Sequence, residues 1–423
     1  MKHTLDLVPR DLLFLRDARP MEASDAGLGA NWPRPDQLYH ALLSAFRLRW
    51  PERQDWEGEE HTRRDESKDV DFRFGALKTF GPFPKKDGKV YFPRPLDLGM
   101  KLVKCEGTDL PAPLEYAFLP AAKGKASLPQ WVSSDTMEKY LAGGMEFKLE
   151  EKDSDLFGAD RNIGIAIDPA TGTTVDGKLY QAEYLRLQEG VSLVCEASCD
   201  MKLKRHDTVL DAYDPAQTGN ERVEQVVLGG QQGMCSLSIA DGELALPKRP
   251  ETQAPTKYVR WTLLTPAVFQ AGKEPDAKEG EPPRKQTDPI FGWLPAWCLR
   301  TDADRVYRDE IGKVMLARPV EPRRAGESRQ DWKARQKAAG TINAKLVAAR
   351  VDKPVAFSGW DLSLGPKPTM LAVPAGSCYV FECATTKDAE DLVAALDGVP
   401  RSDLLGSNGF GIGVCSFVER PTP

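Results

Sequence analysis

One stretch decides the fold of the C-terminal half of this chain: Gly406-Ser407-Asn408-Gly409-Phe410-Gly411-Ile412-Gly413. Its four glycines in eight residues allow the backbone to adopt positive φ and to come close to a ligand. A helical pattern over 388–396 precedes the loop, and an apolar strand over 412–418 follows it. Helix, loop and strand in this order are typical of an α+β unit in which helices cover one face of a sheet.

The spacing of these glycines is superficially similar to the fingerprint of dinucleotide-binding folds. That fingerprint follows a strand and opens a helix, so the reversed order predicted here excludes it. We instead expect Asn408 and the backbone amides of Gly409 and Gly411 to suit phosphate or sugar contacts. Two interpretations stay open for Phe410, which either stacks on a base or packs in the core beneath the last strand.

Length and composition predict two domains. The 423 residues are too many for one small core, and an apolar fraction of 41% is sufficient to fold. No apolar run is long enough to cross a bilayer and the first residues lack a signal-peptide pattern, so we expect a cytoplasmic protein without membrane contact. The net charge of −6 argues against indiscriminate coating of nucleic acid and still permits a local basic groove.

The eight cysteines are scattered along the chain, no Cys-x-x-Cys occurs, and the four histidines are not grouped with them. This pattern predicts no metal site and no cofactor. Cys195, Cys378 and Cys415 lie in apolar, strand-like runs. We expect them to be buried, reduced thiols.

The N-terminal half is predicted to open with a strand over 5–15, kinked at Pro9, and a helix that begins at Pro35. The helix carries an apolar stripe at helical spacing, formed by Leu38, Ala41, Leu42, Ala45 and Phe46. Another face of the same helix carries Asp36, His40, Ser44 and Arg47. The acidic stretch 51–71 after the helix is predicted to be a solvated insertion.

Further strands in this half are predicted in pairs. Residues 72–92 are expected to form strands around Gly81-Pro82 and Asp87-Gly88. Residues 178–187 are expected to form a hairpin with residues 191–197, because a Glu-Gly turn signal separates the two runs.

A short helix is predicted to start at 135–138, where a capping residue precedes an acid by three positions. The sequence becomes Pro-rich and polar over 242–256, which we interpret as the domain boundary. The chain is therefore divided into two domains, residues 1–250 and residues 251–423.

The C-terminal half is predicted to contain strands over 258–264, 347–359 and 370–383, with insertions at 271–289 and 321–340. The second insertion carries six basic and three acidic residues. It either grips RNA or forms a solvated helix with paired charges, and the second interpretation is the more common for such a run. Both halves are therefore predicted to be α+β units with interrupted sheets.

Two groups of residues are candidate RNA contacts. Arg16 and Arg19 follow the first strand, and the forked donors of arginine suit phosphates. Asn31, Arg34 and the first turn of the helix at Pro35 form the second group, because free amides and the helix dipole attract a phosphate. The alternatives are surface ion pairs for the first group and ordinary helix capping for the second.

Several motifs occur in order along nearly the whole chain: Phe14-Leu15-Arg16-Asp17-Ala18-Arg19-Pro20, Phe80-Gly81-Pro82-Phe83, Leu263-Leu264-Thr265-Pro266-Ala267, Phe357-Ser358-Gly359-Trp360-Asp361 and the terminal glycine loop. Together they resemble the third subunit of the Cmr complex, the type III-B CRISPR effector, in the repeat-associated mysterious protein (RAMP) superfamily. Two positions depart from that pattern. His40-Ala41-Leu42-Leu43 stands where the family usually reads Gly-Ala-Leu-Arg, and Gln231-Gln232-Gly233 replaces a charged cluster.

The resemblance implies two tandem ferredoxin-like, RNA-recognition-motif-like RAMP domains with insertions. It implies a noncatalytic scaffold that holds the 5′ tag of the CRISPR RNA. The implied protein partners are the large polymerase/cyclase-type subunit and the backbone RAMP subunit, whose filament is expected to cut target RNA. We therefore expect RNA contacts at Arg16, Arg19, Asn31 and Arg34, on the helix face with His40, Ser44 and Arg47, and in the glycine loop at 408–411.

An alternative function is a metal-independent endoribonuclease that matures CRISPR RNA. His40 would be its general acid or base, with Tyr39, Ser44 and Arg47 as neighbours that stabilise the phosphorane. A single histidine on a helix is more often a packing or hydrogen-bonding residue. The sequence therefore favours the scaffold over the nuclease.

Overall fold

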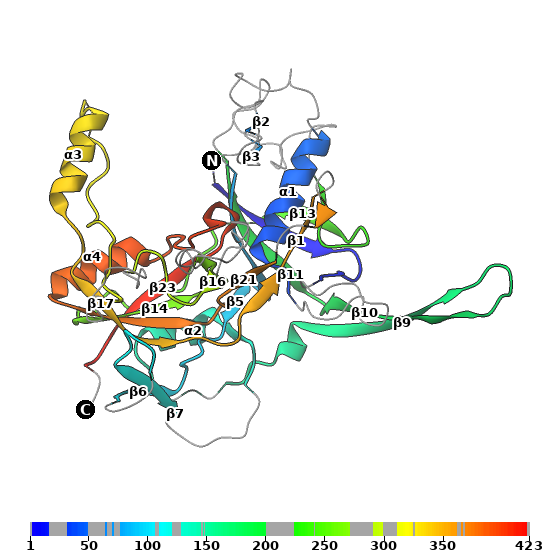
Figure 1. Ribbon diagram of the computed structural model, residues 1–423, viewed down its shortest axis with the longest axis horizontal. Helices are drawn as coiled ribbons and strands as arrows, with labels where there is room; N and C mark the ends of the chain where they lie inside the picture. The colour runs from blue at the N-terminus through cyan, green and yellow to red at the C-terminus, as the bar shows by residue number, and fades with distance from the viewer. Residues whose placement is uncertain are drawn as a thin grey trace, which may run out of the picture.

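The computed structural model describes residues 2–16, 32–49, 64–65, 70–71, 77–105, 110–120, 128–144, 147, 149–199, 224–240, 242–270, 291–298, 311–324, 326–361, 365–366 and 369–420. The predicted insertion at 271–289 lies outside these residues. Most of 51–71 does too, apart from the short pair β2 (Arg64–Asp65) and β3 (Val70–Asp71). The described parts form a mixed α/β protein with antiparallel sheets and few helices (Figure 1).

The N-terminal half is built on a seven-stranded antiparallel sheet in the order β12-β13-β1-β11-β4-β5-β8. Its strands are β1 (Lys2–Pro9), β4 (Lys78–Lys86), β5 (Lys89–Pro93), β8 (Trp131–Ser133), β11 (Val191–Ser198), β12 (Gln225–Val227) and β13 (Met234–Ile239). Helix α1 (Pro35–Arg49) covers one face of this sheet (Figure 1). Its Leu38, Leu42 and Phe46 share a core with Leu5 and Leu7 of β1.

The predicted helix at Pro35 and most of its apolar stripe are confirmed. Leu38, Ala41, Leu42 and Phe46 are buried, whereas His40 and Ser44 on the other face are exposed. The first strand, in contrast, ends at Pro9 and does not continue to residue 15. Proline cannot donate to the ladder, so the following residues make only isolated bridges, such as the one between Leu13 and Leu185.

The predicted hairpin between 178–187 and 191–197 is wrong. Strand β10 (Thr174–Leu187) pairs with β9 (Phe157–Ile167), and β11 pairs with β1 and β4. The turn at 189–190 instead connects β10 in the two-stranded sheet to β11 in the seven-stranded sheet. Burial explains the choice, because most of β11 lies in the core, while β9 exposes alternate isoleucines. The β9–β10 ribbon projects from the body of the molecule (Figure 1).

The two turn signals predicted within 72–92 have different outcomes. Asp87-Gly88 is a turn, with φ values of 50° and 76°, and it joins β4 to β5. Gly81-Pro82 lies inside β4, opposite the irregular register of β11 between Val194 and Glu196. A glycine and a proline therefore mark an irregularity between paired strands here, and not the end of a strand.

The C-terminal half is built on a four-stranded antiparallel sheet in the order β17-β22-β14-β23. Its strands are β14 (Tyr258–Leu263), β17 (Ala344–Arg350), β22 (Cys378–Cys383) and β23 (Gly413–Val418). Helix α4 (Thr386–Leu396) lies on this sheet and packs Leu392 and Leu396 with Trp261 and Phe381. Thr385 caps it, since its hydroxyl accepts a hydrogen bond from the amide of Asp388 at 3.0 Å.

The predicted strands 347–359 and 370–383 are each interrupted. The first gives β17 and β18 (Val355–Phe357), and the second gives β21 (Met370–Ala372) and β22. Gly376 lies in the second break at a φ of 84°, and a side chain there would clash with the carbonyl of Arg94. The break therefore lets the C-terminal half approach the N-terminal half closely.

Smaller elements complete the described fold. They are β6 (Met100–Lys104), β7 (Tyr116–Pro120), α2 (Ser134–Leu141), η4 (Asp153–Asp155), β15 (Phe269–Gln270), β16 (Phe291–Gly292), α3 (Arg329–Ala339), β19 (Trp360–Asp361), β20 (Gly365–Pro366) and η7 (Gly406–Asn408). Helix α2 begins one residue before the predicted start, and its cap is Ser133. Within the described parts of the chain, no helix is long and apolar enough to cross a membrane.

The two halves share a hydrophobic core. Phe92 and Val132 of the first half pack in one cluster with Leu264, Ile412 and Val414 of the second half. The segment 242–257, between β13 and β14, contains no helix or strand.

All eight cysteines are free thiols, and Cys195, Cys378 and Cys415 are buried as predicted. Burial raises the pKa of each of these three thiols above its ordinary value. They are therefore part of the apolar core, where the thiol form is favoured over the thiolate.

Candidate nucleic-acid interface

The start of α1 is organised by Arg34 and Gln37. The backbone N–H of Arg34 donates to Oε1 of Gln37 at 2.9 Å, and the amides of Gln37 and Leu38 donate to the carbonyl of Arg34. Pro35 has no N–H to satisfy. This reciprocal cap satisfies most of the amides that we expected to be free for a phosphate.

The Arg34 side chain is used within the fold. Its guanidinium donates to both carboxylate oxygens of Asp36, at 3.0 and 3.2 Å, and to the carbonyl of Arg16 at 3.1 Å. Only 9% of Arg34 is exposed. The arginine therefore ties the segment that follows β1 to the start of the helix, and its capacity for a further phosphate contact is small.

The glycine loop forms the short helix η7, which Leu405 opens at a φ of 60° and Gly409 closes at a φ of 93°. A Cβ atom on Gly409 would lie 2.6 Å from the carbonyl oxygen of Thr79 in β4, and a Cβ atom on Gly411 would clash with Ser402. Both glycines are therefore required for close approach of the loop to the protein's own backbone.

The structure brings the glycine loop and the start of α1, both predicted to contact RNA, together at one junction between the halves. Oγ1 of Thr79 donates to the carbonyl of Asn408 at 3.0 Å. The ring of Phe410 stacks on Phe357 with centroids 5.4 Å apart, and the Arg34 guanidinium lies 5.2 Å from the centroid of Phe357. The glycine loop is thus placed beside the start of α1.

Phe410 takes the second of the two roles left open by the sequence. Its side chain is 0% exposed and packs with Val268, Phe357 and Ala372. Its stacking partner, Phe357, is part of the same buried cluster. Phe410 therefore fills the core of the junction.

Four predicted residues lie on the surface or at the edges of this junction. His40 and Ser44 are exposed one helical turn apart on α1, and the His40 ring meets Tyr39 edge-on at 5.5 Å. Arg16 and Asn408 are half-buried at the edges of the junction. Arg19, Asn31 and the side chain of Arg47 lie outside the described residues, so their predicted RNA contacts remain predictions.

Thr79 and Phe357 belong to this junction but were not predicted from the sequence. Both lie in or beside motifs that carried the family resemblance, but neither has the charge or hydrogen-bonding pattern expected of an RNA contact. Their role is to hold the loop on α1 and β4, which depends on contacts between residues far apart in the chain. Local sequence patterns do not report such contacts.

A cavity of about 460 Å³ lies elsewhere, beside Lys257, Lys313 and Lys345 at the beginning of β17. It contains none of the predicted RNA-binding residues. The order α4, glycine loop, β23 is the one predicted, and it excludes the strand–loop–helix arrangement of a dinucleotide site.

The antiparallel sheets and the few helices define a mixed α/β protein. A family model described as "CRISPR-associated protein (Cas_Cmr3)" matches residues 5–415. The chain therefore belongs to this family, that of the third subunit of the type III-B Cmr complex. No curated protein matches the chain.

Two solved structures to which the chain shows some similarity are from type III CRISPR assemblies. One is from a cryo-EM structure of type III-B Cmr-beta bound to cognate target RNA and AMPPNP, with 13% identity, a TM-score of 0.41 and coverage of 89% of this chain and 86% of that chain. Another is from a crystal structure of the Csm3-Csm4 subcomplex of a type III-A interference complex, with 12% identity, a TM-score of 0.38 and coverage of 90% and 92%.

Proposed function

We propose that this protein is a noncatalytic RNA-binding scaffold subunit of a type III-B CRISPR ribonucleoprotein. It holds the 5′ tag of the CRISPR RNA where the start of α1 meets the glycine loop. In this role it bridges the large polymerase/cyclase-type subunit to the backbone RAMP filament, and it contacts target RNA only indirectly.

The observation that carries this proposal is the convergence of the glycine loop and the start of α1 at the junction. The contacts of Arg34, Phe357 and Phe410 bring the glycine loop to the helix that bears His40 and Ser44. The resulting surface offers hydroxyl, imidazole and amide groups beside the cationic Arg16. Such groups suit a single strand held by its phosphates and riboses.

Strand order supports the interpretation of both halves as ferredoxin-like domains. In each half, four neighbouring strands lie in the order fourth, first, third and second. They are β13-β1-β11-β4 in the N-terminal half and β23-β14-β22-β17 in the C-terminal half. Helix α1 follows the first strand of one unit, and α4 follows the third strand of the other. We therefore assign residues 1–250 and 251–423 to two RAMP domains with insertions.

Replacement of Arg16 tests the tag site. Arg16→Ala and Arg19→Ala are each expected to weaken binding of tag RNA and to lower the slope of log K against log salt by about 0.7, as expected for one lost phosphate contact on a single strand. Lys353→Ala, which removes an exposed charge on another loop, is the matched control. Tag affinity and salt slope that stay unchanged in both arginine variants contradict the proposed contact.

The exposure of His40 supports one second candidate, a metal-independent endoribonuclease. Incubation of the purified protein with labelled repeat RNA in EDTA separates the two functions. A scaffold leaves the RNA intact. Site-specific cleavage that is lost in His40→Ala would establish the nuclease instead.

A further inference from the structure

Helix α3 is an isolated arm on the C-terminal half. It stands clear of the sheet in Figure 1, and none of its residues is buried. A helix of 11 residues with no fully buried side chain is marginal in water. Polar contacts with the segment that precedes it therefore contribute to its stability.

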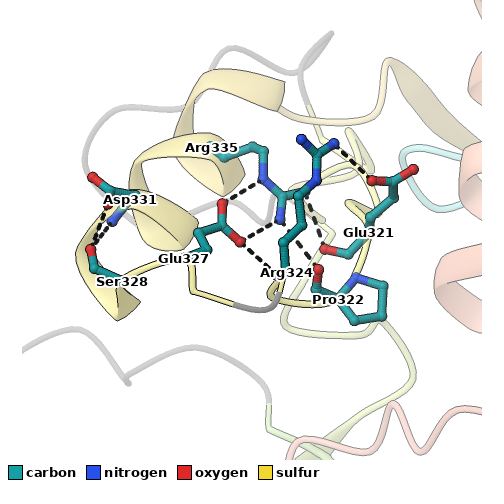
Figure 2. Close-up of polar contacts among 7 residues, drawn as sticks. All are labelled: Glu321, Pro322, Arg324, Glu327, Ser328, Asp331 and Arg335. Carbon is teal, nitrogen blue, oxygen red and sulfur yellow. Dashed lines mark hydrogen bonds and ion pairs between the residues drawn. The ribbon is translucent and has the colours of Figure 1, made fainter.

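Those contacts form a brace around Arg335 (Figure 2). Its guanidinium donates to both carboxylate oxygens of Glu327, at 3.0 and 2.9 Å, and to the carbonyls of Glu321 and Pro322. The Oε2 atom of Glu327 also accepts from the backbone amide of Arg324 at 3.0 Å. Arg335 thus fixes α3 to the loop that precedes it.

The same network uses all three acidic groups of the segment. Glu327 pairs with Arg335, Glu321 pairs with Arg324 at 2.9 Å, and Asp331 accepts from the hydroxyl of the capping Ser328 at 2.7 Å (Figure 2). Two of the six basic side chains are neutralised in this way. The arm therefore keeps a local excess of positive charge in a chain whose net charge is −6.

The remaining cations lie on the outer side of the arm. Arg329, Lys333 and Lys337 are spaced by four residues and exposed, and Arg323 is exposed in the preceding loop. Among the described residues, none of these four makes a hydrogen bond or ion pair through its side chain. The half-buried positions of α3, such as Trp332 and Arg335, fall on the other face. Three cations thus follow one face over about 12 Å of helix.

We propose that this basic face of α3 binds the phosphate backbone of single-stranded RNA without reading its sequence. Charge complementarity selects a polyanion, because evenly spaced cations match a chain of phosphates. An acidic protein is the less suitable partner, since protein interfaces centre on apolar and aromatic anchors and the outer face of α3 presents none. The contact is separate from the proposed tag site and does not depend on it.

The test uses the full-length protein and a fluorescein-labelled oligouridine that lacks the tag. In the variant R329Q/K333Q/K337Q we expect binding about tenfold weaker at low salt and a salt slope reduced by about 2, from three lost phosphate contacts at ~0.7 each. Glutamine maintains helix propensity, and far-UV circular dichroism with urea unfolding verifies the fold. K333R/K337R preserves the charges and is expected to bind like the parent protein.

The matched control is K101Q/K152Q/K353Q, which removes three exposed charges outside the arm. Equal losses in the control and the arm variant would overturn the inference, since only net charge would then matter. Unchanged oligouridine binding by the arm variant would also overturn it. If that variant also fails to join the protein subunits of the effector, the arm binds an acidic protein surface instead.

Discussion

At the scale of single residues, the junction depends on glycines that allow close backbone approach as much as on hydrogen bonds. Gly409 has a φ of 93°, and its α-carbon faces the carbonyl of Thr79 without a side chain between them. Because Thr79 also donates to the carbonyl of Asn408, the loop and β4 are held at backbone distance. The positive φ could be predicted from a glycine-rich loop, whereas the identity of the opposing strand could not.

Replacement of Gly409 by alanine is expected to lower the free energy of unfolding by about 3 kcal/mol, because the new Cβ adds a steric clash to the strain of a positive φ. Urea unfolding measures the change. Gly88→Ala is the matched control, since Gly88 has a φ of 76° but nothing within 4 Å of a new Cβ atom. For Gly88→Ala we expect a loss of only about 1 kcal/mol in the free energy of unfolding. Equal costs at both positions would show that the loop does not press against β4.

At the scale of elements, helices were easier to predict than strand pairs. The 3.6-residue period of α1 and α4 lies within each segment, so Leu38 and Leu392 identify their buried faces without tertiary information. The turn at 189–190 predicts a reversal of the chain, but not which edge the next strand joins. Strand β11 enters the sheet between β1 and β4, where Leu193, Cys195 and Ala197 on one of its faces are buried in the core.

The helix α3 gives a pH prediction at the same scale. The hydrogen bond with Arg335 lowers the pKa of Glu327 to about 2, and Arg324 lowers the pKa of Glu321. Because the folded pKa values lie below the ordinary value, the contribution of these carboxylates is present above about pH 4.5 and is lost as the pH falls toward 2. We expect amide protection over 326–340 to decrease across that window.

Hydrogen exchange followed by mass spectrometry checks this, after correction for the intrinsic pH dependence of exchange. In Glu327→Gln the protection should already be low near neutral pH and should change little with acid. Protection of α3 that is as strong in this variant as in the parent protein would contradict the brace.

At the scale of the whole molecule, a buried polar cluster joins the halves. Arg260 of β14 donates to Asp97 at 3.3 Å and to the carbonyl of Tyr140 at 2.9 Å, and its guanidinium lies 3.7 Å from the centroid of the Tyr140 ring. The Tyr140 hydroxyl donates to Asp97 at 2.6 Å and lies 2.9 Å from the Thr262 hydroxyl. Burial is the main cause that raises the pKa of Tyr140, so the phenol stays protonated and can donate.

Removal of one member of the buried Arg260–Asp97 pair should lower the free energy of unfolding strongly. Arg260→Met leaves Asp97 charged without its partner, and we expect a loss of about 3–5 kcal/mol in the free energy of unfolding. The double variant R260M/D97L should lose less than Arg260→Met alone, because it leaves no unpaired charge. Urea unfolding of the parent and variants tests this, and a double variant less stable than Arg260→Met would contradict the account.

The sequence predicted the family of the protein better than its internal contacts. Motifs in order from residue 14 to residue 413 indicated the family, and the family model that matches residues 5–415 confirms it. The contact of Arg34 with Phe357 was beyond prediction, because it depends on how the two halves pack. For this reason Arg34, expected to contact RNA, proved to be engaged mainly with the protein itself.

Photo-cross-linking of CRISPR RNA that carries 4-thiouridine within its 5′ tag, followed by mass spectrometry of the assembled particle, tests the proposed tag site most directly. We expect cross-links to peptides from 10–16, 32–49 and 405–411, which meet at the junction. Cross-links from the tag that fall only on other parts of this chain, or only on other subunits, would contradict the proposed site.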